Sequence, residues 1–327
     1  MKKVLTISIA AYNVESFIES TLESVCSSKH LDALDIIVQT NGANDKTPEI
    51  ASKWAKKFPN SVRVINVDQN HGYGFTINNS IKHSRGEYFK QLDGDDWFDT
   101  KELDNLIDAL FSAQCDAILN DYTFYYEDTH NKKRITHPYE SLCDLPVSLI
   151  NMYSMHSLTI KTDCLKTPTD IFVTEDCYYT DVEFFIKAIS RARIFKYLPF
   201  NVYYYRWNRE GQSMSYNSIV AHIKEHETVC KNCLEIVTCN GNLLGMHKAI
   251  ETLAIKHLSY LLFCYPSKSN YESFLDYRMY LSKMRVEYRK EFRSVTKLAI
   301  IWPRLFYGPI SRLKRKKYKI DYVGYVD

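Results

Sequence analysis

Hydrophobic runs and amphipathic segments alternate along the first hundred residues of this chain. The runs are short and rich in β-branched side chains, as expected for strands that are buried on both faces of a parallel sheet. They comprise residues 4–10, 34–38, 62–66 and 87–92. The predicted helices between them comprise residues 14–27 with Asn13 as the N-cap, a segment with Pro48 in its first turn, and residues 72–84. This order predicts an α/β fold in which right-handed crossovers build a mostly parallel, Rossmann-like sheet with flanking helices.

The remainder of the chain changes gradually from mixed patterns to helical ones. The pattern predicts strands at residues 116–126, 194–198 and 202–206, an irregular stretch at 127–170, and helices at 243–263 and 271–288. We therefore expect one α/β domain over residues 1–215 and a C-terminal helical accessory region over residues 216–327, which ends in a basic, aromatic tail.

The composition narrows the class of protein. With 45% hydrophobic and 25% charged residues, a chain of 327 residues can bury a large core. The net charge of +3 is small, and the basic residues are dispersed except at residues 312–317, so we expect no nucleic-acid binding. The nine cysteines form no paired framework, and Met1 leads directly into a strand. These features indicate a cytoplasmic protein, and the oligomeric state stays open, a homo-oligomer included.

Three carboxylates follow the fourth predicted strand: Asp93, Asp95 and Asp96, with Trp97 next to them. Such a cluster at the end of a buried strand is costly without a cation. Oxygen ligands are the ones that Mg²⁺ and Mn²⁺ prefer, and these ions usually share their coordination with ligand phosphates. The cluster therefore predicts a metal site beside a phosphorylated ligand.

Two other polar turns, Tyr12-Asn13 and residues 41–45, follow the first and second predicted strands. The carboxyl ends of parallel strands meet at one edge of a sheet, where ligands of such folds bind. We expect these turns and the carboxylates to form a single site.

With these turns, the chain resembles the family 2 glycosyltransferases of the GT-A fold. The resemblance covers roughly residues 4–215 and rests on four motifs in the family's order. They are residues 12–15, residues 41–47, residues 70–74 with Asn78, and residues 86–96. Each motif alone is weak evidence for the family, and the four together at plausible spacing are strong evidence.

The resemblance implies an inverting, metal-dependent enzyme that moves a sugar from a nucleotide-sugar donor, a UDP-sugar being favoured. The acceptor would be a glycan or a lipid-linked glycan in bacterial surface polysaccharide synthesis. Residues 1–98 would form the nucleotide-sugar half and residues 99–215 the acceptor half. Asp93 and Asp95 would hold Mn²⁺ or Mg²⁺. Asp96 and Trp97 would either contact the acceptor or support the metal ligands. The implied donor-binding residues are Ala11, Tyr12, Asn13, Glu15, Thr40, Asn41, Asp45, Gly72, Asn78, Asp93, Gly94, Arg206 and Arg209.

The sequence departs from the family in two of the donor-binding motifs. Thr40 and Asn41 stand where the family usually has two adjacent acids, one of which reads uracil; the Asn41 amide oxygen could accept the same N–H. Ile77 stands where the family often has Arg. The phosphate contact would then pass to Lys90, Arg206 or Arg209.

The resemblance also implies a catalytic base. In the family it is an Asp at the start of a helix with an aromatic residue three positions later, and Asp181 with Phe184 fits. A plain N-cap role for Asp181 stays open. The alternatives in the same segment are Asp176, Glu175 and Glu183.

Two other readings stay open. One is a catalytically inactive nucleotide-sugar or glycan-binding module. The other is a nucleotidyltransferase, which also uses paired acids with Mg²⁺ but usually has a glycine-rich triphosphate loop that this sequence lacks.

The C-terminal region carries two weaker signals. His222, His226, Cys230 and Cys233 share one helix face, but a straight helix cannot surround a zinc ion, so buried thiols are favoured over a zinc site. The segment from Ile300 to Lys317 mixes aromatic and basic residues, which fits either peripheral contact with the inner face of a membrane or a packed terminal helix.

Overall fold

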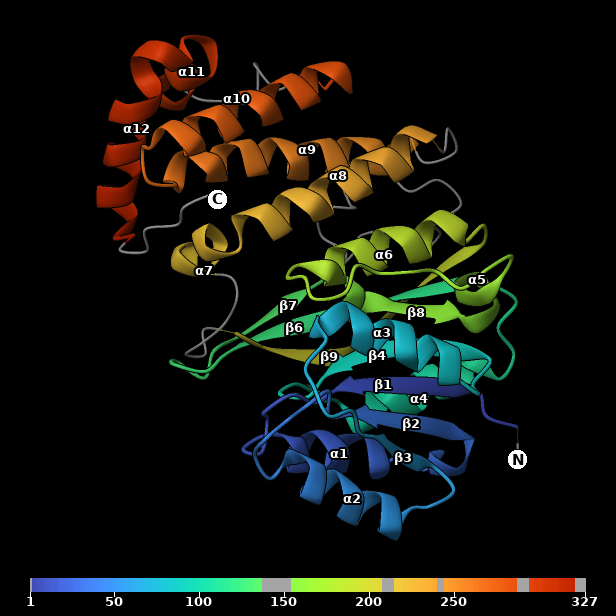
Figure 1. Cartoon of the computed structure of the whole chain (residues 1–327). Coiled ribbons are helices and arrows are strands. Elements are labelled where there is room, and N and C mark those ends of the chain that lie inside the picture. Colours follow the sequence, from blue (N-terminus) through green and yellow to red (C-terminus); the bar gives the residue numbers. More distant parts are fainter. Residues whose placement is uncertain (1, 137–153, 208–214, 240–243, 287–293, 321–327) are drawn as a thin grey trace. The chain divides into compact units, whose positions relative to one another are not determined.

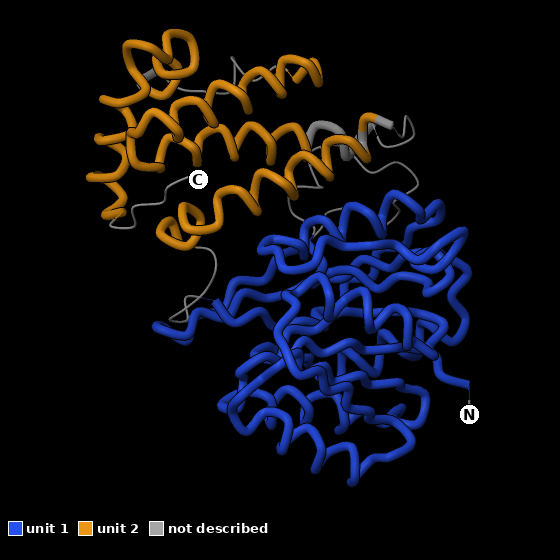
Figure 2. Tube along the Cα trace, in the orientation of Figure 1, with its two compact units in different colours: residues 1–210 blue, residues 211–327 orange. Residues whose placement is uncertain are grey.

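The computed structural model describes residues 2–136, 154–207, 215–239, 244–286 and 294–320. The chain divides into two compact units, residues 1–210 and 211–327 (Figure 2). The strands, all in unit 1, are β1 (Leu5–Ala10), β2 (Leu34–Gln39), β3 (Val62–Ile65), β4 (Tyr88–Asp93), β5 (Trp97–Phe98), β6 (Ala117–Tyr126), β7 (Lys132–Ile135), β8 (Leu158–Lys161) and β9 (Phe195–Trp207). The α-helices of unit 1 are α1 (Ile18–Cys26), α2 (Thr47–Lys57), α3 (Gly72–His83), α4 (Thr100–Leu110), α5 (Thr162–Lys166) and α6 (Thr180–Arg191).

The strands of unit 1 form one sheet in the order β3-β2-β1-β4-β8-β6-β9-β5, with β7 on β6 (Figure 1). β3, β2, β1 and β4 are parallel neighbours, and β8 joins β4 and β6 in the antiparallel sense. On one face α1 packs against α2, α4 and β5, whereas α3 packs against α5, α6 and β1. The α/β fold with a mostly parallel first half is therefore as the sequence predicts.

The pairing of β1 with its two neighbouring strands shows where the expected site lies. Ala10 at the end of β1 is paired with Gln39 on one side and with Asp93 on the other. The loops that follow β1, β2 and β4 consequently leave the sheet next to one another, at the carboxyl ends of the strands.

Three local predictions are wrong. Helix α1 begins at Ile18 with Phe17 as its N-cap, because Asn13 has a φ of 51° and points its side chain at another loop. The two strands expected around Pro199 are one strand, β9, which follows β6 along its whole length through a register shift. The stretch expected to be irregular contains β7, β8 and α5.

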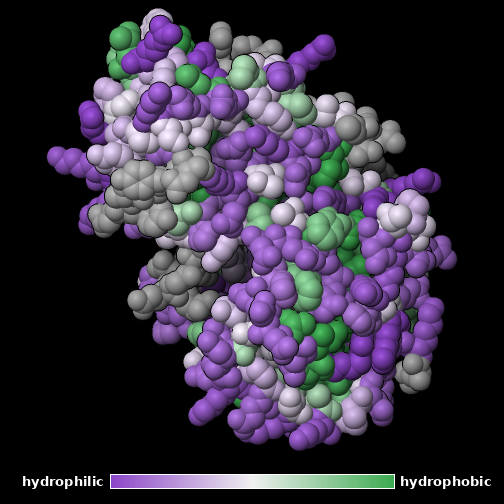
Figure 3. Space-filling model, viewed as in Figure 1, coloured by the Kyte–Doolittle hydropathy of each residue, from purple (hydrophilic) through white to green (hydrophobic). Residues whose placement is uncertain are grey.

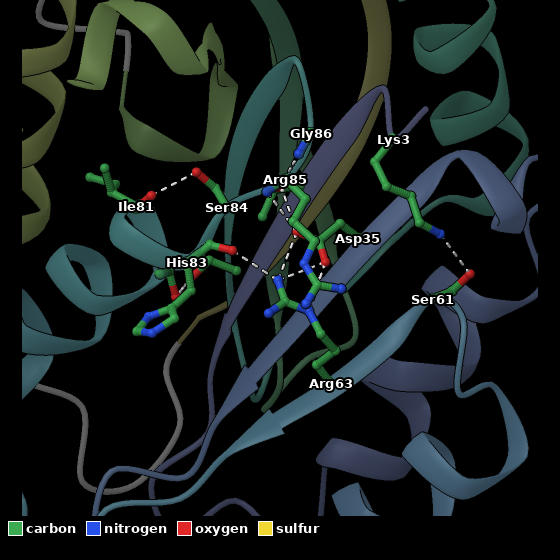
Figure 4. Close-up of polar contacts among 12 residues, drawn as sticks. Lys3, Asp35, Ser61, Arg63, Ile81, His83, Ser84, Arg85 and Gly86 are labelled. Carbon is green, nitrogen blue, oxygen red and sulfur yellow. Dashed lines mark hydrogen bonds and ion pairs between the residues drawn. The ribbon is translucent and has the colours of Figure 1, made fainter. Parts of the chain in front are cut away.

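Asp35 connects the strands at their amino ends, on the side of the sheet opposite the expected site (Figure 4). It is 2% exposed and accepts hydrogen bonds from Nε and Nη2 of Arg63 at 2.9 and 2.8 Å. The Thr6 hydroxyl and the Arg85 backbone N–H also donate to it, each at 3.0 Å. A buried carboxylate thus connects β1, β2, β3 and the turn before β4, at the amino ends of the strands.

Unit 2 is helical in the residues that the structure describes. Its α-helices are α7 (Tyr216–Ala221), α8 (Ile223–Cys239), α9 (Leu244–Tyr260), α10 (Lys268–Lys283), α11 (Ser294–Ile301) and α12 (Pro303–Tyr318). The chain turns at His222, which separates α7 from α8, and α8 packs along α9. Among the described residues, none of the helices combines the length and the hydrophobicity needed to cross a bilayer.

The basic residues of the tail lie on α12. Some of them hydrogen-bond within unit 2, and others are exposed to solvent. Lys314 donates to the Ser259 hydroxyl at 3.2 Å, and Arg315 donates to the Phe263 carbonyl at 2.9 Å. Arg312 and Lys316 are exposed. Hydrophobic atoms also reach the surface over α11, at the upper left of Figure 3.

Candidate active site

The first two loops of the expected site hold each other. Asn13 Oδ1 accepts from the Asn44 N–H at 2.9 Å, and Glu15 Oε2 accepts from the Lys46 N–H at 2.8 Å. In return, Asp45 Oδ2 accepts from the Glu15 N–H at 3.0 Å. Three residues expected at the donor therefore shape the loops by capping backbone groups.

Asn41 joins the second loop to the third. It is 3% exposed, and its amide donates to Asn70 Oδ1 at 3.1 Å and to the Gly72 carbonyl at 2.9 Å. Its oxygen accepts from the His71 N–H at 3.2 Å. The oxygen that was considered for a uracil N–H is thus already bonded inside the protein.

The other residues expected around the donor differ in their access to solvent. Ala11 and Thr40 are 1% and 2% exposed, whereas Tyr12 is 44% exposed. Gly94 donates its N–H to the Ala10 carbonyl, and a Cβ on Gly94 would lie 2.5 Å from that oxygen. Glycine is therefore required where the acidic turn crosses the first loop, and Tyr12 is the exposed aromatic side chain of this loop.

Asp93 is held by two tyrosines from distant segments. Its N–H donates to the Tyr203 hydroxyl oxygen at 3.1 Å, and its Oδ1 accepts from the Tyr73 hydroxyl at 2.5 Å. Burial, and then the charges of Asp95 and Asp181, raise the pKa of Asp93 to about 7, against the hydrogen bonds with Tyr73 and Tyr203, which lower it. Opposing this shift requires positive charge, which is what a cation would supply.

Asp96 is buried and already carries two short hydrogen bonds. The Tyr203 hydroxyl donates to its Oδ2 at 2.6 Å, and the Arg206 N–H donates to its Oδ1 at 2.7 Å. Burial, and then the charges of Asp95 and Asp93, raise its pKa well above the usual carboxylate range. Asp96 thus orients the acidic turn. Asp95 is half-buried, and its backbone carbonyl accepts a hydrogen bond from Arg206 Nε.

His156 joins the carboxylates from a short 3-10 helix, Met155–Ser157, that leads into β8. Ligand atoms of Asp93, Asp96 and His156 all lie within 4.8 Å of one another. His156 Nε2 is 3.9 Å from Asp93 Oδ2 and has no hydrogen-bond partner among the described residues. A buried imidazole nitrogen aimed at two carboxylates is a ready ligand, so this donor set fits a divalent cation. The group contains Asp93, as expected, and does not include Asp95.

Three neighbours hold His156 in place, two at its ring and one at its backbone carbonyl. It stacks on Tyr205 with ring centroids 4.4 Å apart, and Ser154 Oγ lies 2.7 Å from its Nδ1. Lys90 donates to the His156 carbonyl at 2.9 Å. Burial, with a smaller contribution from the Lys90 charge, lowers the pKa of His156 to about 3, so the imidazole is neutral. Lys90 is itself buried, and it supports His156 instead of reaching a phosphate.

Asp181 occupies the first turn of α6 and acts electrostatically on the cluster. Its negative charge contributes to the raised pKa values of Asp93, Tyr73 and Tyr205, in each case after burial. Burial raises the pKa of Asp181 as well, and hydrogen bonds from the Val182 N–H and its own N–H oppose the shift. The structure thus brings Asp181 and Asp93 into one electrostatic environment.

The other acids of this segment have structural partners. Glu183 is fully buried and binds the Thr174 N–H and hydroxyl, each at 3.1 Å, and Lys187 Nζ at 2.6 Å. Glu175 accepts from the Asn78 amide at 2.9 Å. Asn78 therefore holds the acidic segment in place, although it was expected at the donor.

Asp176 packs through its backbone on the third loop. Its N–H donates to the His71 carbonyl at 2.9 Å, and a Cβ on Gly72 would lie 2.8 Å from the Asp176 nitrogen. Gly72 has a φ of 77°, which side chains rarely adopt. The glycine thus lets the third loop approach the segment that carries the acids.

Arg206 is enclosed by aromatic rings. Its guanidinium carbon lies 4.8 Å from the centroids of both Phe17 and Trp97. Nη1 donates to both oxygens of Glu127 at 2.9 Å. Arg206 thus braces β9 against the acidic turn, and Arg209 lies outside the described residues.

The sequence patterns assigned no role to Tyr73, Tyr203 or His156. Tyr73 lies inside the glycine motif of the third loop, so its position was a usable signal. Tyr203 and His156 reach the cluster only through the pairing of β9 and β8 with distant strands, and no local pattern marks them.

Several known proteins resemble this chain. The uncharacterized glycosyltransferase EpsJ of Bacillus subtilis is 32% identical over 118 residues, which are 36% of this chain and only a third, 33%, of that relative. The crystal structure of S. aureus TarS 1-349 in complex with UDP-GlcNAc has a TM-score of 0.65 at 18% identity, over 97% of this chain and 91% of that one. Mannosyltransferase PcManGT from Pyrobaculum calidifontis, in complex with GDP-Man and Mn²⁺, has a TM-score of 0.53 at 13% identity, over 98% and 88%.

At these identities the structural likeness is evidence for the fold, and it confirms the expected GT-A architecture. The family is shown by sequence. Residues 6–177, just over half of the chain, match the profile of glycosyl transferase family 2, and the chain therefore belongs to this family.

Proposed function

We propose that this protein is a metal-dependent, inverting glycosyltransferase that moves a sugar from a UDP-sugar to a glycan or lipid-linked acceptor. The observation that carries the proposal is that Asp93, at the end of β4, belongs to a group of possible metal ligands, and that the charge of Asp181, at the start of α6, acts on its pKa. A single displacement needs positive charge at the leaving diphosphate and a base at the acceptor hydroxyl, and these two acids provide for both.

The proposed metal ligands are Asp93 and His156 of this group, together with Asp95, which the group does not include. The charge of Asp95 acts on the ionisation of Asp93 and Asp96, so its carboxylate lies within electrostatic reach of the cluster. Asp96, with a hydrogen bond to each oxygen, would orient these groups. When bound, the ion would neutralise charge on the departing diphosphate. The imidazole favours Mn²⁺ over Mg²⁺, because Mg²⁺ prefers oxygen ligands.

Asp181 is the proposed base. It lies at a helix N-terminus, where N–H groups favour the ionised carboxylate that can accept a proton from the acceptor hydroxyl. Glu183 is a weaker candidate because its carboxylate is buried and bonded to Thr174 and Lys187.

The first three loops would form the donor pocket in unit 1. Tyr12 would lie against the nucleobase, because it is the exposed aromatic side chain of these loops. The bound UDP-GlcNAc of TarS supports a uridine donor. We assign the donor to residues 1–98, the acceptor side to residues 99–215, and an accessory role to the helical unit. A reducing, cytoplasmic setting and synthesis of a bacterial surface polysaccharide complete the proposal.

The test combines binding with turnover. Melting temperatures of the full chain are measured with UDP-, GDP-, CDP- and dTDP-sugars, with and without Mn²⁺, because a ligand of the native state raises the melting temperature. Release of the nucleoside diphosphate is then measured for Asp181→Asn and for the matched variant Asp176→Asn. We expect Mn²⁺-dependent stabilisation by a UDP-sugar and loss of turnover in Asp181→Asn alone. Binding of a donor by all three proteins with no turnover in any of them, for every acceptor tried, would instead favour an inactive binding module.

A further inference from the structure

Three metal-binding side chains converge in the core of unit 2. His226 and Cys230 lie one turn apart on α8, and His257 lies on α9. They are 6%, 1% and 0% exposed. His226 Nδ1 is 3.0 Å from His257 Nδ1 and 3.3 Å from Cys230 Sγ, and all three atoms lie within 4.8 Å of one another. Their arrangement does not depend on the chemistry proposed for unit 1.

His226 Nδ1 has two neighbours in this arrangement. A ring nitrogen of a neutral imidazole has either one proton to donate or one lone pair to accept with. His226 Nδ1 therefore serves either His257 Nδ1 or Cys230 Sγ, and the Cys230 thiol also has the Leu253 carbonyl, 3.9 Å from its Sγ. A metal ion would accept a lone pair from each of the three side chains at once.

The surroundings of His257 favour the form that binds metals. Glu227 Oε2 lies 3.7 Å from His257 Nε2, and Lys231 Nζ holds the other oxygen of Glu227 at 2.5 Å. A carboxylate beside Nε2 favours the proton on that nitrogen, which leaves the Nδ1 lone pair directed at the cluster. Metal-ligating histidines are commonly oriented in this way by a carboxylate on the opposite nitrogen. The ring of Tyr277 packs edge-on against His257, with centroids 4.5 Å apart.

We propose that His226, Cys230 and His257 bind one Zn²⁺ ion that ties α8 to α9. Two imidazoles and a thiolate are ligands that zinc favours, and a water molecule would complete the tetrahedron. Zn–N and Zn–S bonds of about 2.0 and 2.3 Å place tetrahedral ligand atoms roughly 3.3 to 3.6 Å apart. The observed separations of 3.0 and 3.3 Å need to widen by only a few tenths of an ångström.

His257 on α9 changes the interpretation of the histidines and cysteines that the sequence places on one helix face. A single helix cannot surround an ion, and His257 supplies a ligand from the other side. Of the four residues in the α8 pattern, Cys233 is not part of the group, and His222 pairs with Glu225 at 2.8 Å.

The test uses Co²⁺ as a spectroscopic probe of the reduced, full-length protein after removal of bound metals by a chelator. A bound thiolate gives a sulfur-to-cobalt charge-transfer band in the near ultraviolet, which carboxylate sites do not give. We expect the band to saturate at one Co²⁺ per chain and to disappear when Zn²⁺ is added. It should also persist in Asp95→Asn, which alters only the site proposed in unit 1. Failure of the glycosyltransferase proposal and failure of the zinc proposal are thereby separated.

Two variants and a control locate the ion. Cys230→Ala and His257→Gln should lose the band, whereas Cys264→Ala, which removes another fully buried thiol of unit 2, should keep it. Zn²⁺ should raise the melting temperature of the wild type and of Cys264→Ala more than that of Cys230→Ala. Circular dichroism checks that each variant is folded, and Cys230→Ala alone decides if His257→Gln is not. A folded wild type without the band, or a band that survives in Cys230→Ala, overturns the proposal.

Discussion

At the scale of single residues, Asp181 determines how turnover should depend on pH. Burial raises its pKa, and the backbone N–H groups of the first turn of α6 oppose the shift. A base acts only when ionised, so turnover should fall as the pH decreases through this raised value. The acid limb of kcat/KM should therefore lie above the value of about 4 that is usual for an aspartate.

Asp181→Asn should lower turnover by about 10²-fold or more, the typical contribution of general base catalysis. The donor should still raise the melting temperature of this variant, because the substitution removes charge and little volume. Asp176→Asn is the matched control, since its backbone conformation, with a φ of 48°, suits Asn equally well. Wild-type turnover in Asp181→Asn would remove Asp181 as the base.

His156 should set the metal requirement. His156 Nε2 has no hydrogen-bond partner among the described residues, so replacing His156 by Ala should raise the Mn²⁺ concentration for half-maximal activity by about 10- to 100-fold. Tyr122→Phe is the control, because the Tyr122 ring stacks on His156 with centroids 5.5 Å apart and lies outside the metal-binding group. The measurement is nucleotide release against Mn²⁺ concentration, and equal curves for His156→Ala and the wild type would exclude His156 as a ligand.

At the scale of elements, the sequence predicted the parallel half well, because strands buried on both faces produce continuous apolar runs that local periodicity detects. It failed where a side chain finds a distant partner. Asn13 does not cap α1, because its amide oxygen binds the N–H of Asn44 in another loop. The same limit applies to the site: the loops were found from local motifs, whereas His156 and Tyr203 arrive through strand pairing.

The buried carboxylate at the amino ends of the strands should contribute to stability and not to catalysis. Asp35→Ala removes the carboxylate partner of Arg63, which among the described residues keeps only the His83 carbonyl, and it removes the acceptor for Thr6 and Arg85. We expect the free energy of unfolding to fall by about 3–5 kcal/mol, as for other broken buried ion pairs. Urea denaturation measures this change.

Glu49→Ala is the control for Asp35→Ala. Its pair with Lys53 is solvent-exposed on both sides, so the free energy of unfolding should change little. Donor binding by folded Asp35→Ala should match the wild type, because Asp35 lies at the edge opposite the site. A similar small loss in both variants would show that the network around Asp35 is not a significant source of stability.

At the scale of the whole molecule, α12 combines the two alternatives left open for the tail. One side packs in unit 2, where Tyr307 and Ile310 are buried and Lys314 and Arg315 hydrogen-bond. The outward-facing residues include Leu305, Arg312, Leu313 and Lys316. These four recur at helical spacing, so they share one face, and an apolar stripe with cations is typical of helices that lie on anionic membranes.

We therefore expect the full chain to pellet with vesicles that contain anionic lipid and not with neutral ones. Serine at Arg312, Lys316 and Lys317 should weaken binding by about 100-fold, since each basic residue near such a surface contributes about 1 kcal/mol. Serine at Lys53, Lys56 and Lys57, all exposed on α2, changes the net charge equally and is the control. Equal loss of vesicle binding in both variants would mean that binding follows net charge. If the wild type does not pellet, α12 is a packed terminal helix, because Lys314 and Arg315 already have partners inside unit 2.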